Sequence, residues 1–245
     1  MLNKQDFTII LPVLNEELAI GVVIQELLDY GYDNILVVDG NSTDATLEIV
    51  SSFNLPLLSQ EGAGKTGALT TAISNIQTPY FLVMDGDNTY DPNDIAKFLR
   101  IVEGHDQVFG VRERNIHISN LHKFGNWIIN KTISVLYGKD ITDACTGMYL
   151  LKTESAKKLE FITSGFEVEV EMAIQNLING KIAEVPINYR NRIGESKLDT
   201  WKIGSTIMLK IIKMSFYYKS RMPLIILLLF IAGFLLSVGS GYISL

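Results

Sequence analysis

The sequence predicts an α/β domain, built in its first half on a parallel sheet and followed by two carboxyl-terminal helices of different character. Short apolar runs rich in strand-forming residues alternate with helical patterns, and the connections between them are short. Such alternation is typical of a parallel sheet with crossover helices. Further along, a basic amphipathic pattern leads into a charge-free apolar run. We therefore expect a globular domain over 1–198, an amphipathic helix over 199–221 and a transmembrane helix over 222–245.

The elements of the first half follow one another regularly. The stretch after Glu16 has helical spacing, because Ile20, Val23 and Leu27 fall on one side of it, and Gly31 ends it. The expected strands of this half are 7–11, 35–38, 55–59 and 80–84, and the expected helices end at Asp29, Phe53, Ile73 and Val102.

The pattern changes after an expected strand at 107–111, where Arg112 and Arg114 begin a polar loop. The regular alternation is not expected to continue beyond this loop. The remaining expected elements are a helix at 121–137, a strand at 147–151, a helix at 166–178 and a strand at 182–185.

The strand at 80–84 leads into an acidic turn, which is the strongest functional signal from the residues themselves. Asp85 and Asp87 flank Gly86, and Asp91 follows. In open α/β sheets, ligands bind at the carboxyl ends of the strands. Two carboxylates so close together favour a shared cation, and Mg²⁺ is usually held by one or two carboxylates plus substrate phosphates. The alternative is a solvated acidic loop.

Composition excludes several classes of protein. A net charge of −6 and a pI of about 5.1 argue against a nucleic-acid binder that depends on phosphate contacts. The single Cys145 excludes an intramolecular disulfide and a cysteine metal site.

The carboxyl-terminal run has no charged residue between Pro223 and Leu245, a length typical of a transmembrane helix. Lysines and arginines precede this run, and none follows it. The positive-inside rule then predicts a single-pass protein of the cell membrane with its folded domain in the cytoplasm.

The helix expected at 201–218 is amphipathic. Lys202, Lys210 and Lys213 share one face, and apolar residues including Ile207 and Ile211 share the opposite face. A basic amphipathic helix next to an apolar span is typical of a helix that lies in the membrane interface. An ordinary surface helix is the alternative.

Several longer motifs follow one another in a fixed order along the chain. The series is FTIILPVLNEE, VVDGNSTDAT, GKTGAL, VMDGDNTYDP, GVRER, DACTGMYLL, GFEVEVEM and VPINYRNRIGESKL. It resembles the family 2 glycosyltransferases of GT-A fold, and more narrowly the branch of dolichyl-phosphate mannose synthase and related polyprenyl-phosphate sugar transferases. The resemblance implies a Rossmann-like mixed sheet.

The resemblance also implies a donor site for a nucleotide-diphosphate sugar, UDP- or GDP-linked. The residues that match the family's donor-binding positions are Pro12, Leu14, Glu16, Val38, Asp39, Lys65, Asp85, Gly86, Asp87, Arg112, Arg192 and Lys197. Catalytic roles are implied for Asp85, Asp87, Arg112 and Asp143, and Mg²⁺ or Mn²⁺ would be bound by Asp85, Asp87 and Thr89. Two alternatives stay open: either Arg190 or Arg192 reaches the phosphate, and Asp143 is either catalytic or a turn-forming cap.

The class of acceptor is inferred from how easily it ionises. A lipid phosphate is largely ionised near neutral pH and needs positioning more than a strong base. Arg114 and Lys123 are the candidates for binding it. We therefore expect an inverting, metal-dependent transfer of one hexose or N-acetylhexosamine to dolichyl or polyprenyl phosphate, feeding protein N-glycosylation or cell-surface glycan assembly.

Other partners and two rival functions accompany this hypothesis. Membrane lipid is an expected partner, a homo-oligomer is possible, and nucleic acid is not expected. The first rival is a family 2 enzyme that extends a glycan or lipid-linked saccharide at a hydroxyl, which would need a base such as Asp143 or Glu167. The second is a nucleotide-sugar binder without catalytic activity.

Overall fold

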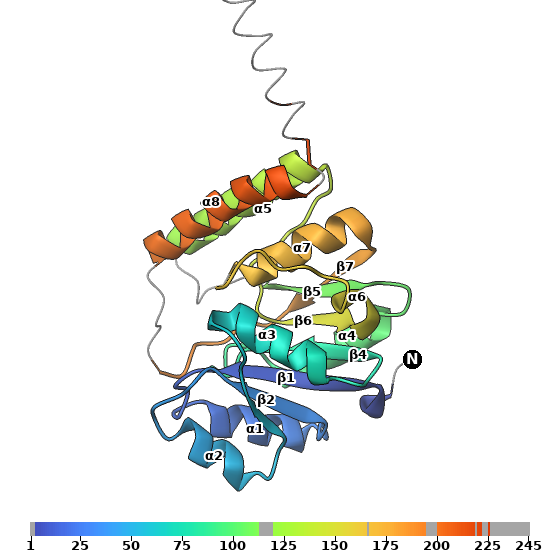
Figure 1. The fold of residues 1–245 in the computed structure, drawn as a ribbon. Coiled ribbons are helices and arrows are strands. Elements are labelled where there is room, and N and C mark those ends of the chain that lie inside the picture. Colours follow the sequence, from blue (N-terminus) through green and yellow to red (C-terminus); the bar gives the residue numbers. More distant parts are fainter. Residues whose placement is uncertain are drawn as a thin grey trace, which may run out of the picture.

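The described part of the chain folds around one mixed sheet of seven strands with helices on both faces (Figure 1). The computed structural model describes residues 3–112, 120–165, 167–194, 200–218, 220–221 and 225. The strand order is β3-β2-β1-β4-β6-β5-β7. The strands are β1 (Phe7–Val13), β2 (Ile35–Asp39), β3 (Leu57–Ser59), β4 (Tyr80–Val83), β5 (Gln107–Arg112), β6 (Tyr149–Lys152) and β7 (Ile182–Ile187). The α-helices are α1 (Ile20–Asp29), α2 (Thr46–Ser52), α3 (Gly64–Asn75), α4 (Ile95–Ile101), α5 (Asn120–Tyr137), α6 (Thr153–Ala156), α7 (Val168–Asn179) and α8 (Thr200–Tyr217), with 3₁₀ turns η1 (Lys4–Asp6) and η2 (Pro92–Asp94).

The first four strands are parallel, as the alternation predicted. β1 lies between β2 and β4, with Ile9 in register with Ile35 on one side and with Leu82 on the other. The carboxyl ends of these strands therefore meet at one edge of the sheet. β6 runs antiparallel to both β4 and β5, which makes the sheet mixed.

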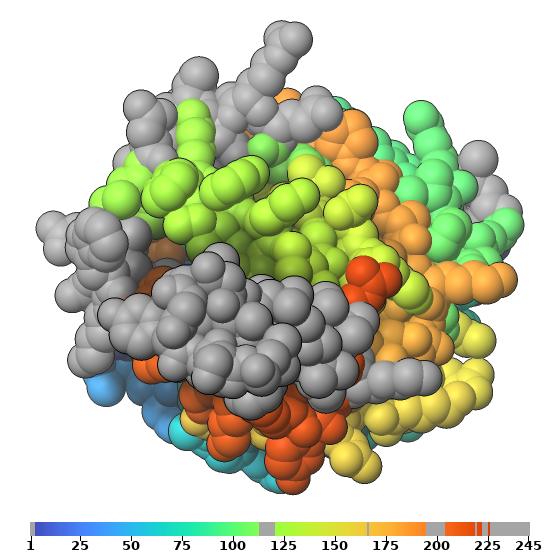
Figure 2. Space-filling model, turned by 90° about the horizontal axis from the view of Figure 1, so that it is seen from above, coloured from blue at the N-terminus to red at the C-terminus, as the bar shows by residue number. Residues whose placement is uncertain are grey.

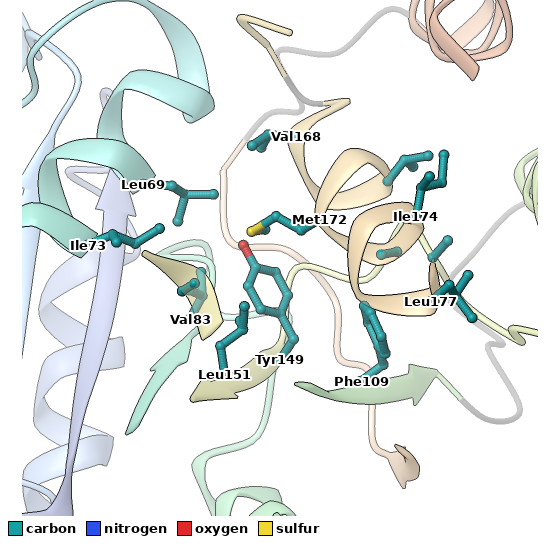
Figure 3. Close-up of a cluster of buried hydrophobic side chains, with 14 of the residues drawn as sticks. Leu69, Ile73, Val83, Phe109, Tyr149, Leu151, Val168, Met172, Ile174 and Leu177 are labelled. Atoms are coloured by element: carbon teal, nitrogen blue, oxygen red, sulfur yellow. The ribbon is translucent and has the colours of Figure 1, made fainter. Parts of the chain in front are cut away.

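Two hydrophobic cores cover the two faces of the sheet. One packs α1 and α4 against it and contains Phe98. The other packs α3 and α7 against it, and Figure 3 shows Leu69 of α3, Tyr149 of β6 and Met172 of α7 meeting there. Full burial of each large side chain contributes about 1.5–3 kcal/mol relative to exposure, so both faces need their helices.

The helices α5 and α8 form an outer pair beyond α7 (Figure 1). Both are amphipathic. On α5 the buried residues Ile129 and Ile133 are one turn apart, as are Ile207 and Ile211 on α8. The helix predicted at 121–137 is confirmed, and α8 lies within the segment that was predicted to be amphipathic.

The prediction of a transmembrane helix, and of a single-pass membrane location with a cytoplasmic domain, is corrected. None of the helices in the described ranges is both long enough and apolar enough to span a membrane. The two longest described helices, α5 and α8, are not apolar enough for a physical reason. Polar and charged residues, such as Lys131 on α5 and Lys213 on α8, alternate with the apolar ones. The predicted segment 222–245 lies outside the described residues except for Ile225.

Candidate active site

Loops at the carboxyl edge of β1 and β2 are fixed to each other by hydrogen bonds from main-chain N–H groups to side-chain oxygens. Asn15, whose φ is 52°, accepts a hydrogen bond from the Thr43 N–H at 2.7 Å. The Asn15 N–H donates to the Ser42 hydroxyl at 2.8 Å, and the Glu16 N–H donates to the Thr46 hydroxyl at 2.8 Å. The first loop therefore presents Glu16 from a fixed backbone.

Asp39 ends β2 and organises the turn that follows it. Its buried carboxylate accepts hydrogen bonds from the N–H groups of Asn41, at 2.9 Å, and Ser42, at 3.1 Å. Asn41 has a φ of 69°, so the carboxylate stabilises a left-handed residue. Pro12 and Val38 are cross-strand partners just before this turn. Val38 is fully buried and offers a ligand only its main chain.

Asp85 lies two residues after β4, and its side chain is partly buried. Its Oδ1 contacts the Lys65 ammonium at 2.5 Å, and its Oδ2 faces Gly147, where a Cβ would lie 2.1 Å away. Gly86 is also closely packed, since a Cβ there would lie 2.9 Å from a methyl group of Val13. Glycine at both positions lets the acidic turn pack between β1 and the start of β6.

Asp87 is buried, and its two oxygens have different partners. Oδ1 accepts hydrogen bonds from the N–H and the hydroxyl of Thr89, at 3.1 and 2.5 Å, and Oδ2 pairs with Arg192 at 2.5 Å. Burial raises the pKa of Asp87, and the charge of Asp85 raises it further, while Thr89 and Arg192 oppose the rise. The two carboxylates of the turn thus repel each other, and a bound cation would relieve that repulsion.

The structure distinguishes the two arginines that the sequence left open. Arg192 bridges Asp87 and Glu16, so it joins the acidic turn to the loop after β1. Arg190 instead pairs with Glu26 of α1 at 2.7 Å and with Asp91 at 2.9 Å. Arg192 is therefore the arginine that contacts Asp87, and which of the two reaches the phosphate stays a prediction.

Arg112 and Asp143 form a bidentate pair beside the turn. The distances are 2.7 Å from Nε to Oδ2 and 2.7 Å from Nη2 to Oδ1, and both side chains are 9% exposed. Burial acts to lower the pKa of Arg112, but Asp143, together with Tyr90 and Tyr189, outweighs burial and holds that pKa well above its ordinary value. The guanidinium also lies 5.3 Å from the ring centre of Tyr189. Asp143 is therefore paired with a guanidinium group that stays protonated.

The acidic turn fits a divalent cation whose coordination is completed by substrate. Within the described residues, no three or more His, Cys, Asp or Glu side chains form a group that could hold a metal ion. Asp85 and Asp87 supply the one or two carboxylates that Mg²⁺ usually takes from protein, and phosphates and water supply the rest. The Thr89 hydroxyl donates to Asp87, so it supports that carboxylate, and its role as a direct ligand stays a prediction.

A cavity of about 350 Å³ opens between the end of β5 and α5. Its lining includes Arg112, Lys123, Trp127, Lys131 and Asp143. The predicted acceptor residue Lys123 thus shares one cavity with the Arg112–Asp143 pair. The predicted residues Arg114 and Lys197 lie outside the described residues.

Sequence reasoning missed Glu169. Glu167, Glu169 and Glu171 alternate along the chain, and all three are buried. Glu169 pairs with Lys65, Glu167 lies 3.3 Å from Lys210, and Glu171 accepts hydrogen bonds from the loop before α7.

The chain is similar to known proteins in sequence and in fold. The sequence model of the glycosyl transferase family 2 matches residues 8–160. A glycosyltransferase named AglJ from Haloferax volcanii is 35% identical over 211 residues, covering 83% of this chain and 70% of the relative. A dolichyl-phosphate hexose transferase from the same organism is 31% identical over 223 residues, covering 89% of this chain and 97% of the relative.

Solved structures share the fold. A glucosyl-3-phosphoglycerate synthase from Mycobacterium tuberculosis, crystallised with Mn²⁺, UDP and phosphoglyceric acid, superimposes with a TM-score of 0.70 at 20% identity, covering 85% of this chain and 78% of that chain. The same synthase with Mg²⁺ and UDP gives a TM-score of 0.67 at 19% identity, covering 84% and 78%. The expected GT-A-like mixed sheet is thereby confirmed.

Proposed function

Because this chain belongs to the family 2 glycosyltransferases, we propose that it moves one hexose or N-acetylhexosamine from a UDP- or GDP-linked sugar to dolichyl or another polyprenyl phosphate, with inversion. One observation carries the choice of acceptor: of the two carboxylates that line the cavity, Asp143 is neutralised by Arg112, and Asp140 lies exposed at the surface. A hydroxyl acceptor needs a base, whereas an ionised phosphate needs only cations to position it. The relative named as a dolichyl-phosphate hexose transferase supports the same acceptor class.

The donor would bind at the acidic turn. Mg²⁺ or Mn²⁺ on Asp85 and Asp87 would supply positive charge to the leaving diphosphate. Arg192, already paired with Asp87, is in reach of the same turn and would donate hydrogen bonds to the diphosphate oxygens. Stabilising charge where it develops is commonly the largest contribution to catalysis, so these groups carry the proposed rate enhancement.

The acceptor would bind in the cavity between β5 and α5. Lys123 and Lys131 supply ammonium groups for its phosphate. Its apolar chain would contact the exposed apolar residues of the outer helices. These are Leu121, Phe124 and Trp127 on α5, of which Trp127 is 59% exposed, and Leu209, Ile212 and Phe216 on α8. Both helices are exposed on the face seen in Figure 2, and contact of this face with membrane lipid is part of the proposal.

The experiment that tests the function uses the purified chain with Mn²⁺, dolichyl phosphate and a panel of labelled nucleotide sugars. The expected product is a dolichyl-phosphate monosaccharide identified by its mass. Hydrolysis of the donor without sugar on the lipid would contradict the proposed acceptor.

Replacing Lys123 with Ala should weaken the use of lipid phosphate. Loss of a charge-assisted hydrogen bond to the acceptor would raise the transition-state free energy by roughly 1.5–3 kcal/mol. The measurement is kcat/KM for dolichyl phosphate at saturating donor. The matched control is Lys158→Ala, because Lys158 is exposed and pairs with Glu154 on the surface. An equal loss in both variants, or a change in donor KM for Lys123→Ala, would contradict a role at the acceptor.

Asp143→Asn and Glu167→Gln should each reduce turnover less than loss of Asp87 does. In the proposed reaction neither carboxylate removes a proton, since Asp143 is bound to Arg112 and Glu167 lies against Lys210. The measurement is kcat with dolichyl phosphate, alongside an alcohol-bearing glycan as rival acceptor. If either carboxamide variant is inactive and the glycan is the better acceptor, the glycan-extending function replaces this one.

A further inference from the structure

A buried lysine, Lys65, links three parts of the fold next to the acidic turn. Lys65 lies in the first turn of α3, and its ammonium contacts Asp85, after β4, at 2.5 Å. The same ammonium pairs with Glu169 in the first turn of α7. The side chains of Lys65 and Glu169 are 9% and 8% exposed. One buried cation is therefore shared between a buried carboxylate, Glu169, and a partly exposed one, Asp85, whose side chain is 31% exposed.

The surroundings of this pair are rigid and mostly apolar. Gly64, with a φ of 61°, packs so closely on the loop before α7 that a Cβ would lie 2.4 Å from the Ser164 carbonyl oxygen. Tyr149 is fully buried nearby, and its hydroxyl points toward Met172 of α7 (Figure 3). Within the described residues that hydroxyl has no hydrogen-bond partner. The low polarity strengthens every charge interaction inside the cluster.

The charges depend on each other. Burial acts to lower the pKa of Lys65, but Asp85 and Glu169 outweigh burial and hold that pKa well above its ordinary value. Burial raises the pKa of Glu169, and Lys65 opposes that rise. The Lys65 ammonium thus divides its contacts between one carboxylate at the donor edge and one that is not.

We propose that Glu169 is a positioning residue of the transfer site: it holds part of the Lys65 charge away from Asp85, so that Asp85 stays able to bind the donor's divalent cation. A buried ammonium that pairs with Asp85 alone would compete with that cation at short range. The partner on α7 reduces the competition while Lys65 still fixes the direction of the Asp85 side chain. The inference rests on the proposed metal-dependent transfer.

The test measures binding of Mn²⁺ in the presence of UDP or GDP, with the electron paramagnetic resonance signal of free Mn²⁺ as readout. Glu169→Gln should weaken Mn²⁺ binding about tenfold, equivalent to ~1.4 kcal/mol. Glu169→Asp keeps the charge and should lose less. The double variant Lys65→Met with Glu169→Gln also removes the competing ammonium and should bind Mn²⁺ more tightly than Glu169→Gln alone. Glu154→Gln, on an exposed carboxylate, is the matched control and should bind as the parent does.

The Mn²⁺ affinities of these variants distinguish a positioning role of Glu169 from a merely structural one. Parent-like binding by Glu169→Gln, or a double variant as weak as Glu169→Gln, would overturn the inference, because a merely structural loss is not restored by a second deletion. Should Glu169→Gln fail to fold in a thermal unfolding assay, Glu169→Asp and the double variant decide by the same criteria. Mn²⁺ binding that survives Asp87→Ala, or none in the parent, would instead overturn the proposed metal site and this inference with it.

Discussion

Asp87→Ala is expected to lower kcat by about 1,000-fold or more while the chain stays folded. Asp87 is one of the two carboxylates proposed to hold the donor's cation, and it also fixes Arg192 at the turn. The variant therefore loses charge stabilisation of the leaving diphosphate from two sources. Chelation of divalent cations should have the same effect on the parent. The measurement is sugar transfer to dolichyl phosphate, with circular dichroism as the check on folding.

Asp91→Ala is the matched control for this prediction. Asp91 lies on the same turn, accepts a hydrogen bond from the Asn93 N–H at 2.9 Å and pairs with Arg190, but it does not contact Asp87 or Arg192. Its loss should remove a helix cap at a cost of about 0.5–2 kcal/mol in unfolding free energy and leave most of the turnover. Full activity of the parent in excess chelator would refute the metal role.

Gly147→Ala is expected to lower kcat/KM by about 100-fold through displacement of Asp85. The added Cβ would lie 2.1 Å from Asp85 Oδ2, far inside van der Waals contact, so Asp85 or the start of β6 must move. The main chain is also held there, because the Gly147 N–H donates to the Tyr90 hydroxyl at 2.6 Å. A shift of the carboxylate by about 1 Å is enough to cost activity of this order. The readouts are kcat/KM for the donor and Mn²⁺ affinity.

Gly204→Ala is the control for the added methyl group. A Cβ at Gly204 meets nothing within 4 Å, and the residue lies inside α8. Helix propensity predicts a gain of about 0.5–1 kcal/mol in stability and no loss of turnover. Parent-like kinetics of Gly147→Ala would mean that the position of Asp85 does not limit the reaction.

Local sequence patterns predicted much of the fold because they report on local physics. The parallel strands and their helices follow from apolar periodicity, and their observed ends differ from the expected ones by a few residues. The helix expected after Asp91 begins as the 3₁₀ turn η2 before α4, since Pro92 fits a first turn. The first helix begins at Ile20, later than Glu16, because Glu16 belongs to the loop that is fixed to Thr46.

The carboxyl-terminal part of the chain shows where the local sequence pattern was insufficient to predict the structure. The charge-free run after Pro223 has the composition of a membrane span, but none of the described helices has the length and apolar character to be one. On α8, Lys210 was expected on a basic outer face, yet it reaches Glu167 of the loop before α7. Periodicity gives the side of a helix on which a lysine lies, and the neighbouring element decides whether it meets solvent or a carboxylate.

The sequence by itself determined the family, the acidic turn and the elements that bring the turn to the edge of the sheet. These depend on residue types in a fixed order and on short-range periodicity. Only the tertiary structure decided which charged side chains pair with each other. Arg192, and not Arg190, pairs with Asp87, Arg112 pairs with Asp143, and Glu169 pairs with Lys65. Such pairs join residues up to 105 positions apart. Their energies depend on distance and burial in three dimensions, which spacing along the chain does not encode.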